Sequence, residues 1–238
     1  MVSDPPKRSD APARVKVFGL GLNKTGTKTL GRCLQHLGYR HQSYSTAALE
    51  MFVQGRVADL VRAAHQFDSC EDWPWPLIWR ELYEEFGDAA RYVLTRRSSS
   101  QVWIESLKAH ALNTHPTMAM RPRVYGYYYP HGYEGEHIAA YERHNSAVRT
   151  FFEQRAPHAF LEVCWEEGAG WRDLSRFLGT AEPDVPFPHE RPLREGTPEA
   201  VKAANAANIG RQLADIARGL RQVVNAPLMT AQDSTRQE

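Results

Sequence analysis

The stretch that decides the fold runs from Val15 to Leu34 and reads VKVFGLGLNKTGTKTLGRCL. Residues 15–20 are mostly apolar and partly β-branched, a pattern typical of a buried strand. Apolar residues then recur at helical spacing: Leu30, Cys33, Leu34 and Leu37. The sequence therefore predicts a strand and a helix joined by a short loop, residues 21–29, that is rich in small and cationic side chains.

This loop has the composition of a phosphate-binding site. The first N–H groups of a helix have no intrahelical acceptor and carry the positive end of the helix dipole, so they bind anions. Gly26 lets the backbone approach a ligand closely. Hydroxyl donors and positive charges accompany these amides: Thr25, Thr27 and Thr29, with Lys24 and Lys28. The ordinary alternative is a glycine-threonine turn with solvated lysines, and the loop alone leaves it open.

The spacing within the loop distinguishes two phosphate-binding motifs. Counted from Gly21, the second glycine of a Walker A loop falls correctly at Gly26, but Thr27 stands where the lysine belongs. Residues 24–30 instead read Lys-Thr-Gly-Thr-Lys-Thr-Leu. This segment resembles the 5′-phosphosulfate loop of the sulfotransferases that use 3′-phosphoadenosine 5′-phosphosulfate (PAPS).

A second group of anion-binding side chains follows a second predicted strand, residues 89–95. Arg96 and Arg97 come directly after this strand, and guanidinium groups bind phosphate bidentately, although a surface turn with a serine cap is the alternative. In the PAPS sulfotransferases an arginine and a helical serine at this place form the 3′-phosphate site. The run Leu-Thr-Arg-Arg, Trp103 and Ser106 are similar to that pattern. Arg97 and Ser106 are nine positions apart, one more than usual, which leaves open which arginine binds.

Further segments resemble the same family in its order along the chain. They are Asp72–Pro74, Trp79–Leu82, Tyr141–Asn145 and residues 167–189. The resemblance covers most of residues 15–190 and implies the P-loop-like sulfotransferase fold, an α/β/α structure of three layers with a mostly parallel sheet. We expect one sulfotransferase-like domain at 14–224, a disordered leader at 1–13 and a flexible tail at 225–238.

Candidates for a general base lie in residues 67–79, FDSCEDWPWPLIW. A carboxylate in a loop lined by aromatic side chains has a raised proton affinity and can accept a proton. Asp72 is the first candidate, followed by Glu71 and Asp68. Judged from the residues alone, Asp72 is better interpreted as the cap of the helix that follows.

The resemblance implies transfer of a sulfuryl group from PAPS to a hydroxyl or amine of a small-molecule, lipid or glycan acceptor, leaving 3′-phosphoadenosine 5′-phosphate. Residues 24–29 would hold the 5′-phosphosulfate, and Arg96, Arg97 and Ser106 the 3′-phosphate. Lys24 would stabilise the leaving group, and no metal is expected. Two alternatives stay open: a small-molecule kinase that uses ATP and magnesium, with Asp68 or Asp72 as its acidic residue, and a noncatalytic nucleotide-binding protein.

Composition narrows the class of protein. The formal net charge of +1 argues against a general nucleic-acid binder. The three cysteines lack the spacing of a zinc site or a disulfide framework. No run approaches the roughly 20 apolar residues of a membrane span, and the N-terminus lacks the apolar region of a secretory signal. We therefore expect a cytoplasmic protein.

The second half of the chain carries three further predictions. Residues 110–133, rich in tyrosine and proline and without periodicity, predict a long loop that forms part of the acceptor pocket. The alternative is an aromatic loop that only packs over the sheet. Residues 140–153 predict a helix in which His144 is a structural histidine rather than a base. A third strand is expected at 159–164, and an alanine-rich helix at 198–224.

Overall fold

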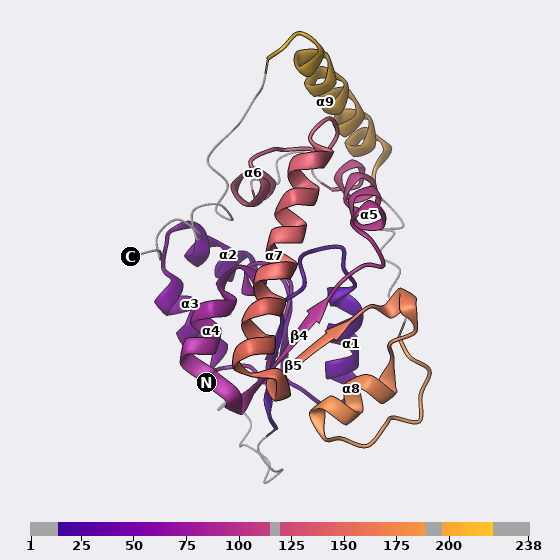
Figure 1. Ribbon diagram of the computed structural model, residues 1–238. Helices are drawn as coiled ribbons and strands as arrows, with labels where there is room; N and C mark the ends of the chain where they lie inside the picture. The colour runs from indigo at the N-terminus through magenta and orange to yellow at the C-terminus, as the bar shows by residue number, and fades with distance from the viewer. Residues whose placement is uncertain (1–13, 115–119, 189–196, 221–238) are drawn as a thin grey trace, which may run out of the picture.

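The computed structural model describes residues 14–114, 120–188 and 197–220; the predicted leader at 1–13 and tail at 225–238 lie outside them. Within the described residues, one sheet holds five parallel strands in the order β2-β3-β1-β4-β5 (Figure 1). The strands are β1 Lys16–Gly19, β2 His41–Gln42, β3 Ser69–Cys70, β4 Ala90–Thr95 and β5 Phe160–Val163. The predicted parallel sheet is confirmed.

Helices join successive strands, as parallel pairing requires. The first group is α1 Thr27–His36, α2 Thr46–Val53, α3 Val57–Ala64, α4 Trp79–Phe86 and α5 Ser100–Leu112. The second group is α6 Met120–Tyr125, α7 Glu134–Arg155, α8 Trp171–Leu178 and α9 Glu199–Ala217. No helix of the described residues is long and apolar enough to cross a membrane.

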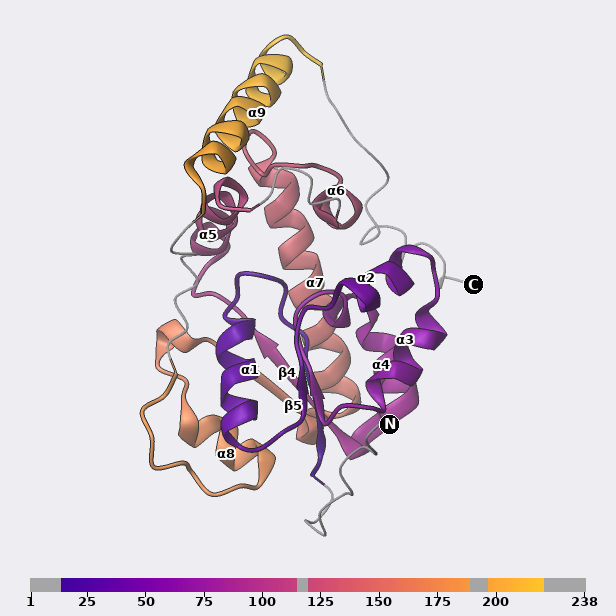
Figure 2. The same ribbon diagram turned by 180° about the vertical axis from the view of Figure 1, so that it is seen from behind.

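Side chains of the central strands alternate between two hydrophobic cores, one on each face of the sheet. Val17 of β1 and Val93 of β4 pack in the core that contains residues of α1 and α8. Phe18 and Tyr92, their neighbours in sequence, pack in the other core, with residues of α4 and α7. Figures 1 and 2 show α7 covering one face and α1 and α8 the other. The three predicted layers are therefore present.

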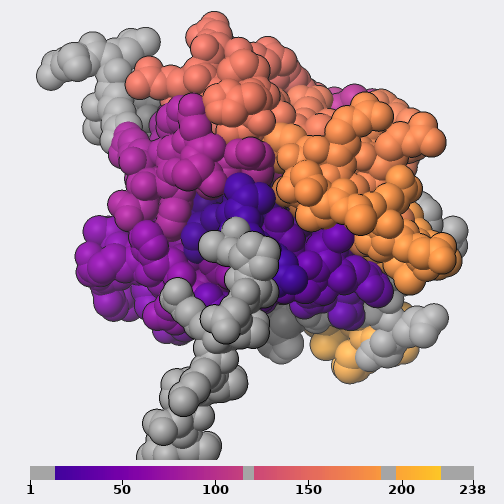
Figure 3. Space-filling model, turned by 90° about the horizontal axis from the view of Figure 1, so that it is seen from below, coloured from indigo at the N-terminus to yellow at the C-terminus, as the bar shows by residue number. Residues whose placement is uncertain are grey.

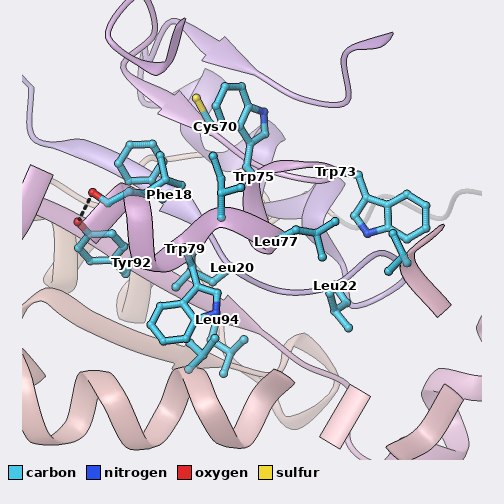
Figure 4. Packing of buried hydrophobic residues seen from close by; sticks show 14 of the residues in the cluster. Phe18, Leu20, Leu22, Cys70, Trp73, Trp75, Leu77, Trp79, Tyr92 and Leu94 are labelled. Carbon is cyan, nitrogen blue, oxygen red and sulfur yellow. Dashed lines mark hydrogen bonds between the residues drawn. The ribbon is translucent and has the colours of Figure 1, made fainter. Parts of the chain in front are cut away.

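Buried tryptophans dominate the larger core. Trp79, the first residue of α4, lies near Leu94 of β4 and Leu20, the residue after β1, and Trp75 lies beside Cys70 of β3 (Figure 4). Trp73 is also buried and lies near Leu22, at the end of the sheet where β1 leads into the 21–29 loop. Each large apolar side chain buried in this way contributes about 1.5–3 kcal/mol. The tryptophan-rich segment thus fixes the position of Asp72, which immediately precedes it.

Helix α9 lies beyond the carboxyl ends of the strands, beside α5 (Figures 1 and 2). Asn205, which is fully buried, donates to the carbonyls of Leu112 and Thr114 at 2.9 and 2.7 Å and accepts from the hydroxyl of Tyr129 at 2.9 Å. One polar side chain therefore ties α9 to the end of α5.

Figure 3 shows the opposite end of the molecule, where residues of the 160–188 segment (orange) lie beside the N-terminal segments (indigo to purple).

Three sequence predictions need correction. The region 110–133 is not one long loop, because α5 extends to Leu112 and α6 occupies Met120–Tyr125. Helix α7 begins at Glu134 rather than at 140. The C-terminal helix ends at Ala217 rather than 224, where Gly219 adopts a φ of 78° that the helix cannot continue through.

Candidate active site

The 21–29 loop presents an uncapped helix N-terminus at the carboxyl end of β1. Gly26, with a φ of 91°, is the N-cap of α1, and because glycine has no side chain this cap supplies no side-chain hydrogen bond to the first turn. No acidic residue lies in that turn either. The N–H groups of Thr27, Lys28 and Thr29 therefore lack a side-chain acceptor from the cap, the arrangement that binds anions. Thr27 and Thr29 are buried and Lys28 is exposed.

Two contacts lock this loop to the end of β4. The hydroxyl of Thr25, a fully buried side chain, donates to the carbonyl of Leu22 at 2.6 Å and lies 2.7 Å from the hydroxyl of Thr95. A Cβ on Gly21 would come within 2.0 Å of that same Thr95 hydroxyl, so only glycine fits. The Thr25 hydroxyl, predicted as a ligand donor, thus makes its hydrogen bonds within the protein.

The ammonium of Lys24 is held in the site without a fixed partner. Lys24 adopts a φ of 72°, uncommon for a residue with a side chain, and is half-buried. Among the described residues, none forms a hydrogen bond or ion pair with its Nζ. Burial lowers the pKa of Lys24, with smaller effects in the same direction from Lys28 and Arg97, while Asp72 opposes them. The side chain is therefore positioned to meet a negative charge that the protein itself does not supply.

The two predicted anion sites lie side by side. Arg97 donates from Nη1 to the backbone carbonyl of Lys24 at 3.1 Å. Arg96 turns away, toward β5, and its guanidinium binds Glu162 at 2.7 Å and Glu167 at 2.6 and 3.0 Å. The consecutive arginines therefore differ in role, since Arg97 faces the 21–29 loop and Arg96 is engaged by two carboxylates.

Glu166 occupies the donors that Arg97 presents. Its carboxylate accepts from Nε of Arg97 at 2.8 Å, from Nη2 of the same side chain, and from the backbone N–H and hydroxyl of Ser98, both at 2.9 Å. The hydrogen bond from Arg97 is the main reason that the pKa of Glu166 falls to about 2. Sequence reasoning missed Glu166. The available signal was an acidic pair, Glu166 and Glu167, shortly after the end of β5, the strand next to β4.

The serines that follow β4 make different contacts. Ser99 is the N-cap of α5, where its hydroxyl accepts from the N–H of Val102 at 3.2 Å. The serine-cap alternative is therefore correct for Ser99. Ser106 lies within α5 and is half-buried, and among the described contacts no hydrogen bond joins it to Arg96 or Arg97. Ser98, rather than Ser106, is the serine that shares an acceptor with Arg97.

Asp72 does not cap the following helix. Helix α4 begins at Trp79 with Ile78 at its N-cap, whereas the carboxylate of Asp72 accepts from the N–H of Trp73 at 2.7 Å. The capping interpretation is therefore wrong. Burial, followed by the charge of Glu71, raises the pKa of Asp72 to about 7, and Lys28 and Lys24 oppose this increase. Asp72 is thus a carboxylate with raised proton affinity, and its charge interacts with those of the lysines of the 21–29 loop.

The other two predicted carboxylates lie in different surroundings. Glu71 is 1% exposed; its Oε1 accepts from the hydroxyl of Ser43 and lies 3.5 Å from Nε2 of His41, and among the described residues its Oε2 has no partner. Asp68 precedes β3 and accepts from the backbone N–H of Arg40 at 2.8 Å. It therefore lies at the amino-terminal end of the sheet, and the structure does not bring it to the site.

Aromatic side chains hold the loop from two sides. Asn23 accepts at its backbone carbonyl from the indole of Trp103 at 3.0 Å, and at Oδ1 from the hydroxyl of Tyr125 at 2.6 Å. On the other side, the indole of Trp165 donates to the carbonyl of Gly26 at 3.1 Å, and a Cβ on Gly26 would lie 2.4 Å from that ring. These contacts were missed because they join segments far apart in the sequence.

His144 has the structural role that the sequence predicts. Its Nε2 lies 2.7 Å from the carbonyl of Leu20, at the end of β1. Burial lowers the pKa of His144 to about 4, so the ring is neutral at physiological pH. The histidine holds α7 against the base of the 21–29 loop.

A comparison with protein families identifies this arrangement. The model of a sulfotransferase domain matches residues 16–194, which is most of the chain. The chain belongs to the sulfotransferase family. A search of curated proteins gave no match. The matched region of this sulfotransferase contains both predicted anion-binding segments, the Asp-Trp-Pro segment and Glu166, whereas α9 lies beyond it.

Proposed function

We propose that this sulfotransferase transfers the sulfuryl group of PAPS to a hydroxyl or amine of a small-molecule, lipid or glycan acceptor. The proposal depends on one observation, the hydrogen bond from Arg97 to the carbonyl of Lys24. PAPS carries phosphate groups at both ends of one adenosine. Two anion-binding groups at the tips of the neighbouring strands β1 and β4 suit such a molecule better than a donor with a single phosphate chain.

The N–H groups that open α1 would hold the 5′-phosphosulfate, with Lys24 and Lys28 supplying positive charge. The hydroxyls of Thr27 and Thr29 lie in the same helical turn. Arg97 and Ser98 would hold the 3′-phosphate with the donors that now bind Glu166. Arg96 would act indirectly, because its ion pairs with Glu162 and Glu167 fix the backbone from which Arg97 extends.

The chemical step follows from the two charged groups of the site. The acceptor oxygen or nitrogen attacks sulfur, the bond from sulfur to the bridging oxygen breaks, and its electron pair stays on the 5′-phosphate of the leaving nucleotide. The ammonium of Lys24 stabilises the charge that grows on that oxygen. Because no described residue binds its ammonium, Lys24 can follow the bridging oxygen as the bond lengthens.

Asp72 would accept the proton that the acceptor loses. Its raised pKa, near the operating pH, suits a general base. Glu71 is a weaker candidate, since it is buried against Ser43 and His41. Asp72 and Lys24 each influence the pKa of the other, so their charges interact. This supports a base and a leaving-group cation that act in the same site.

A kinase that uses ATP and magnesium remains the leading alternative, and a noncatalytic nucleotide-binding protein is the third. ATP has no 3′-phosphate for Arg97 to bind, so the position of Arg97 next to the 21–29 loop argues against the kinase. A noncatalytic protein could bind the same nucleotide, and only the transfer assay distinguishes it from an enzyme. The expectation of a cytoplasmic enzyme without affinity for nucleic acid is retained as part of the proposal.

The test is a transfer assay with radiolabelled PAPS and a panel of phenols, alcohols and amines. Wild type should label at least one class of acceptor, and Lys24→Ala should not. Transfer of phosphate from labelled ATP with magnesium, without transfer from PAPS, would overturn the proposal. Binding of 3′-phosphoadenosine 5′-phosphate without transfer to any acceptor class would favour the noncatalytic alternative.

A further inference from the structure

Arg121 carries a buried guanidinium that lacks a carboxylate partner in the part of the chain that the structure describes. It lies on α6 and is 4% exposed. Its Nη1 is 3.5 Å from the carbonyl of Tyr128, at the limit of a hydrogen bond, and its Nη2 has no hydrogen-bond partner among the described residues. No ion pair joins Arg121 to a carboxylate in that part of the chain. A charge in such surroundings costs several kcal/mol of folding free energy.

The other arginines near the sheet are held differently. Arg96 binds Glu162 and Glu167, Arg97 binds Glu166, and Arg149 binds Glu162. The protein thus neutralises these partly buried guanidinium groups with glutamates. Arg121 is more deeply buried than any of them, and no carboxylate within 14–114, 120–188 or 197–220 forms an ion pair with it.

The surroundings of Arg121 are phenols and imidazoles. Burial lowers its pKa to about 10, and the nearby hydroxyls of Tyr129 and Tyr125 oppose this shift. The charge of Arg121 in turn contributes to the lowered pKa of His131 and His137. Nδ1 of His131 is itself buried without a hydrogen-bond partner among the described residues. Polar groups in this region therefore lack the acceptors that a folded core normally supplies.

This region adjoins the candidate active site. Arg121 and Tyr125 lie four positions apart on α6, and so share one face of that helix. The hydroxyl of Tyr125 donates to Asn23 of the 21–29 loop at 2.6 Å. The ring of Tyr125 also lies 5.8 Å from that of Trp73, the residue after Asp72. One helical turn thus separates Arg121 from the wall of the site where the acceptor would lie.

We propose that Arg121 binds an oxyanion, such as a carboxylate, carried by the acceptor, so that the substrate class is an acidic hydroxy or amino compound. This inference rests on the proposed function for the position of the acceptor. A guanidinium binds a carboxylate bidentately, and this would satisfy Nη2. Neutral lipids and uncharged alcohols are then poor acceptors.

The first experiment measures the stability of the protein without ligand. Arg121→Met keeps an unbranched stem of similar shape and removes the buried charge, so the melting temperature should rise by about 2–4 °C or more. Arg123→Met, on the same helix but exposed, should leave it unchanged. A fall in the melting temperature of Arg121→Met would show that the guanidinium is structural and would overturn the proposal.

The second experiment measures binding by calorimetry for three matched acid and amide pairs: 4-hydroxybenzoate, 4-hydroxyphenylacetate and 3-(4-hydroxyphenyl)propionate, each against its amide. Wild type should bind at least one acid tenfold or more tightly than its amide, and Arg121→Met should lose that preference while Arg123→Met keeps it. Equal binding of acid and amide in all three pairs, or a preference that survives in Arg121→Met, would overturn the proposal.

A separate titration keeps the two proposals apart. Affinity for 3′-phosphoadenosine 5′-phosphate should be the same in wild type and Arg121→Met. If wild type fails to bind this nucleotide while the acid preference depends on Arg121, the proposed donor is wrong and the oxyanion site stands.

Discussion

Arg97 donates from Nη1 to the backbone carbonyl of Lys24 at 3.1 Å, and so joins the end of β4 to the loop that follows β1. The two residues are 73 positions apart in the sequence. Because β1 and β4 are adjacent parallel strands, their carboxyl ends meet at one edge of the sheet, where α/β proteins bind ligands. Had the two segments lain on opposite faces, one nucleotide could not contact both.

Lys24 should act on turnover more than on binding. Lys24→Met is expected to lower kcat by about 10²–10³-fold, since it removes the charge that stabilises the leaving group. Affinity for 3′-phosphoadenosine 5′-phosphate should change far less, because backbone N–H groups provide much of the binding. Radiolabel transfer and calorimetry measure the two effects. Lys28→Met, at an exposed position, is the matched control, and an equal loss of kcat there would contradict the assignment.

Arg97 and Arg96 form a matched pair for the 3′-phosphate. Arg97→Met should weaken binding of 3′-phosphoadenosine 5′-phosphate by about 10–100-fold and leave that of 5′-AMP unchanged, as expected for loss of a charge-assisted hydrogen bond. Arg96→Met should leave the ratio of the two affinities near that of wild type, because its guanidinium binds Glu162 and Glu167.

A substitution at Glu166 tests the same role of Arg97 in the opposite direction. Glu166→Gln removes a competing carboxylate from Arg97, so affinity for 3′-phosphoadenosine 5′-phosphate should rise. If Arg96→Met abolishes the preference over 5′-AMP and Arg97→Met keeps it, the roles of the two arginines are reversed.

The pH profile tests Asp72 as the base. A base must be ionised, and the pKa of Asp72 is raised to about 7, so kcat/KM should fall as the pH drops below 7. Glu71→Gln removes the neighbouring charge that contributes to this increase, so the acidic limb should move to lower pH. Asp68→Asn, at the other end of β3, should leave the limb in place. Full activity of Asp72→Asn on its acceptor would rule out this base.

His144 predicts how stability depends on pH. Its pKa is about 4 in the folded protein, against the ordinary histidine value of 6.5, so the unfolded chain binds more protons between these values. The free energy of unfolding is therefore unaffected by His144 above pH 6.5 and falls as the pH drops toward 4. His144 accounts for about 3 kcal/mol of this decrease. Urea unfolding across that range should show a shallower dependence in His144→Gln than in wild type. His36→Gln, at an exposed position, is the control and should show the pH dependence of wild type. The same pH dependence in His144→Gln as in this control would contradict the prediction.

The sequence predicted the elements that carry strong local patterns. The run from β1 into α1 combines a buried strand, a glycine at positive φ and a periodic helix, and all three are present. Strands β2 and β3 were missed because each has two residues, too few to show a period. Helix α6 was missed because its six residues lie among prolines and tyrosines that mark loops.

The sequence predicted the cationic residues of the candidate site, but it did not predict the residues that bind or hold them. Lys24 and Arg97 stand out because positive charge and glycine or serine occur together at strand ends. Glu166 and Asn23 depend on contacts between distant segments, which a single sequence does not encode locally. Asp72 was interpreted as a cap because acidic residues commonly precede helices, but the 3₁₀ turn Trp75–Ile78 separates it from α4.

The most direct test of the account is calorimetric titration of the wild-type chain with 3′-phosphoadenosine 5′-phosphate and, separately, with ATP plus magnesium. If the two anion-binding segments hold opposite ends of one nucleotide, the 3′-phosphorylated compound binds with 1:1 stoichiometry and at least tenfold more tightly than ATP. Binding of ATP with magnesium, and no heat with 3′-phosphoadenosine 5′-phosphate, would contradict the central claim.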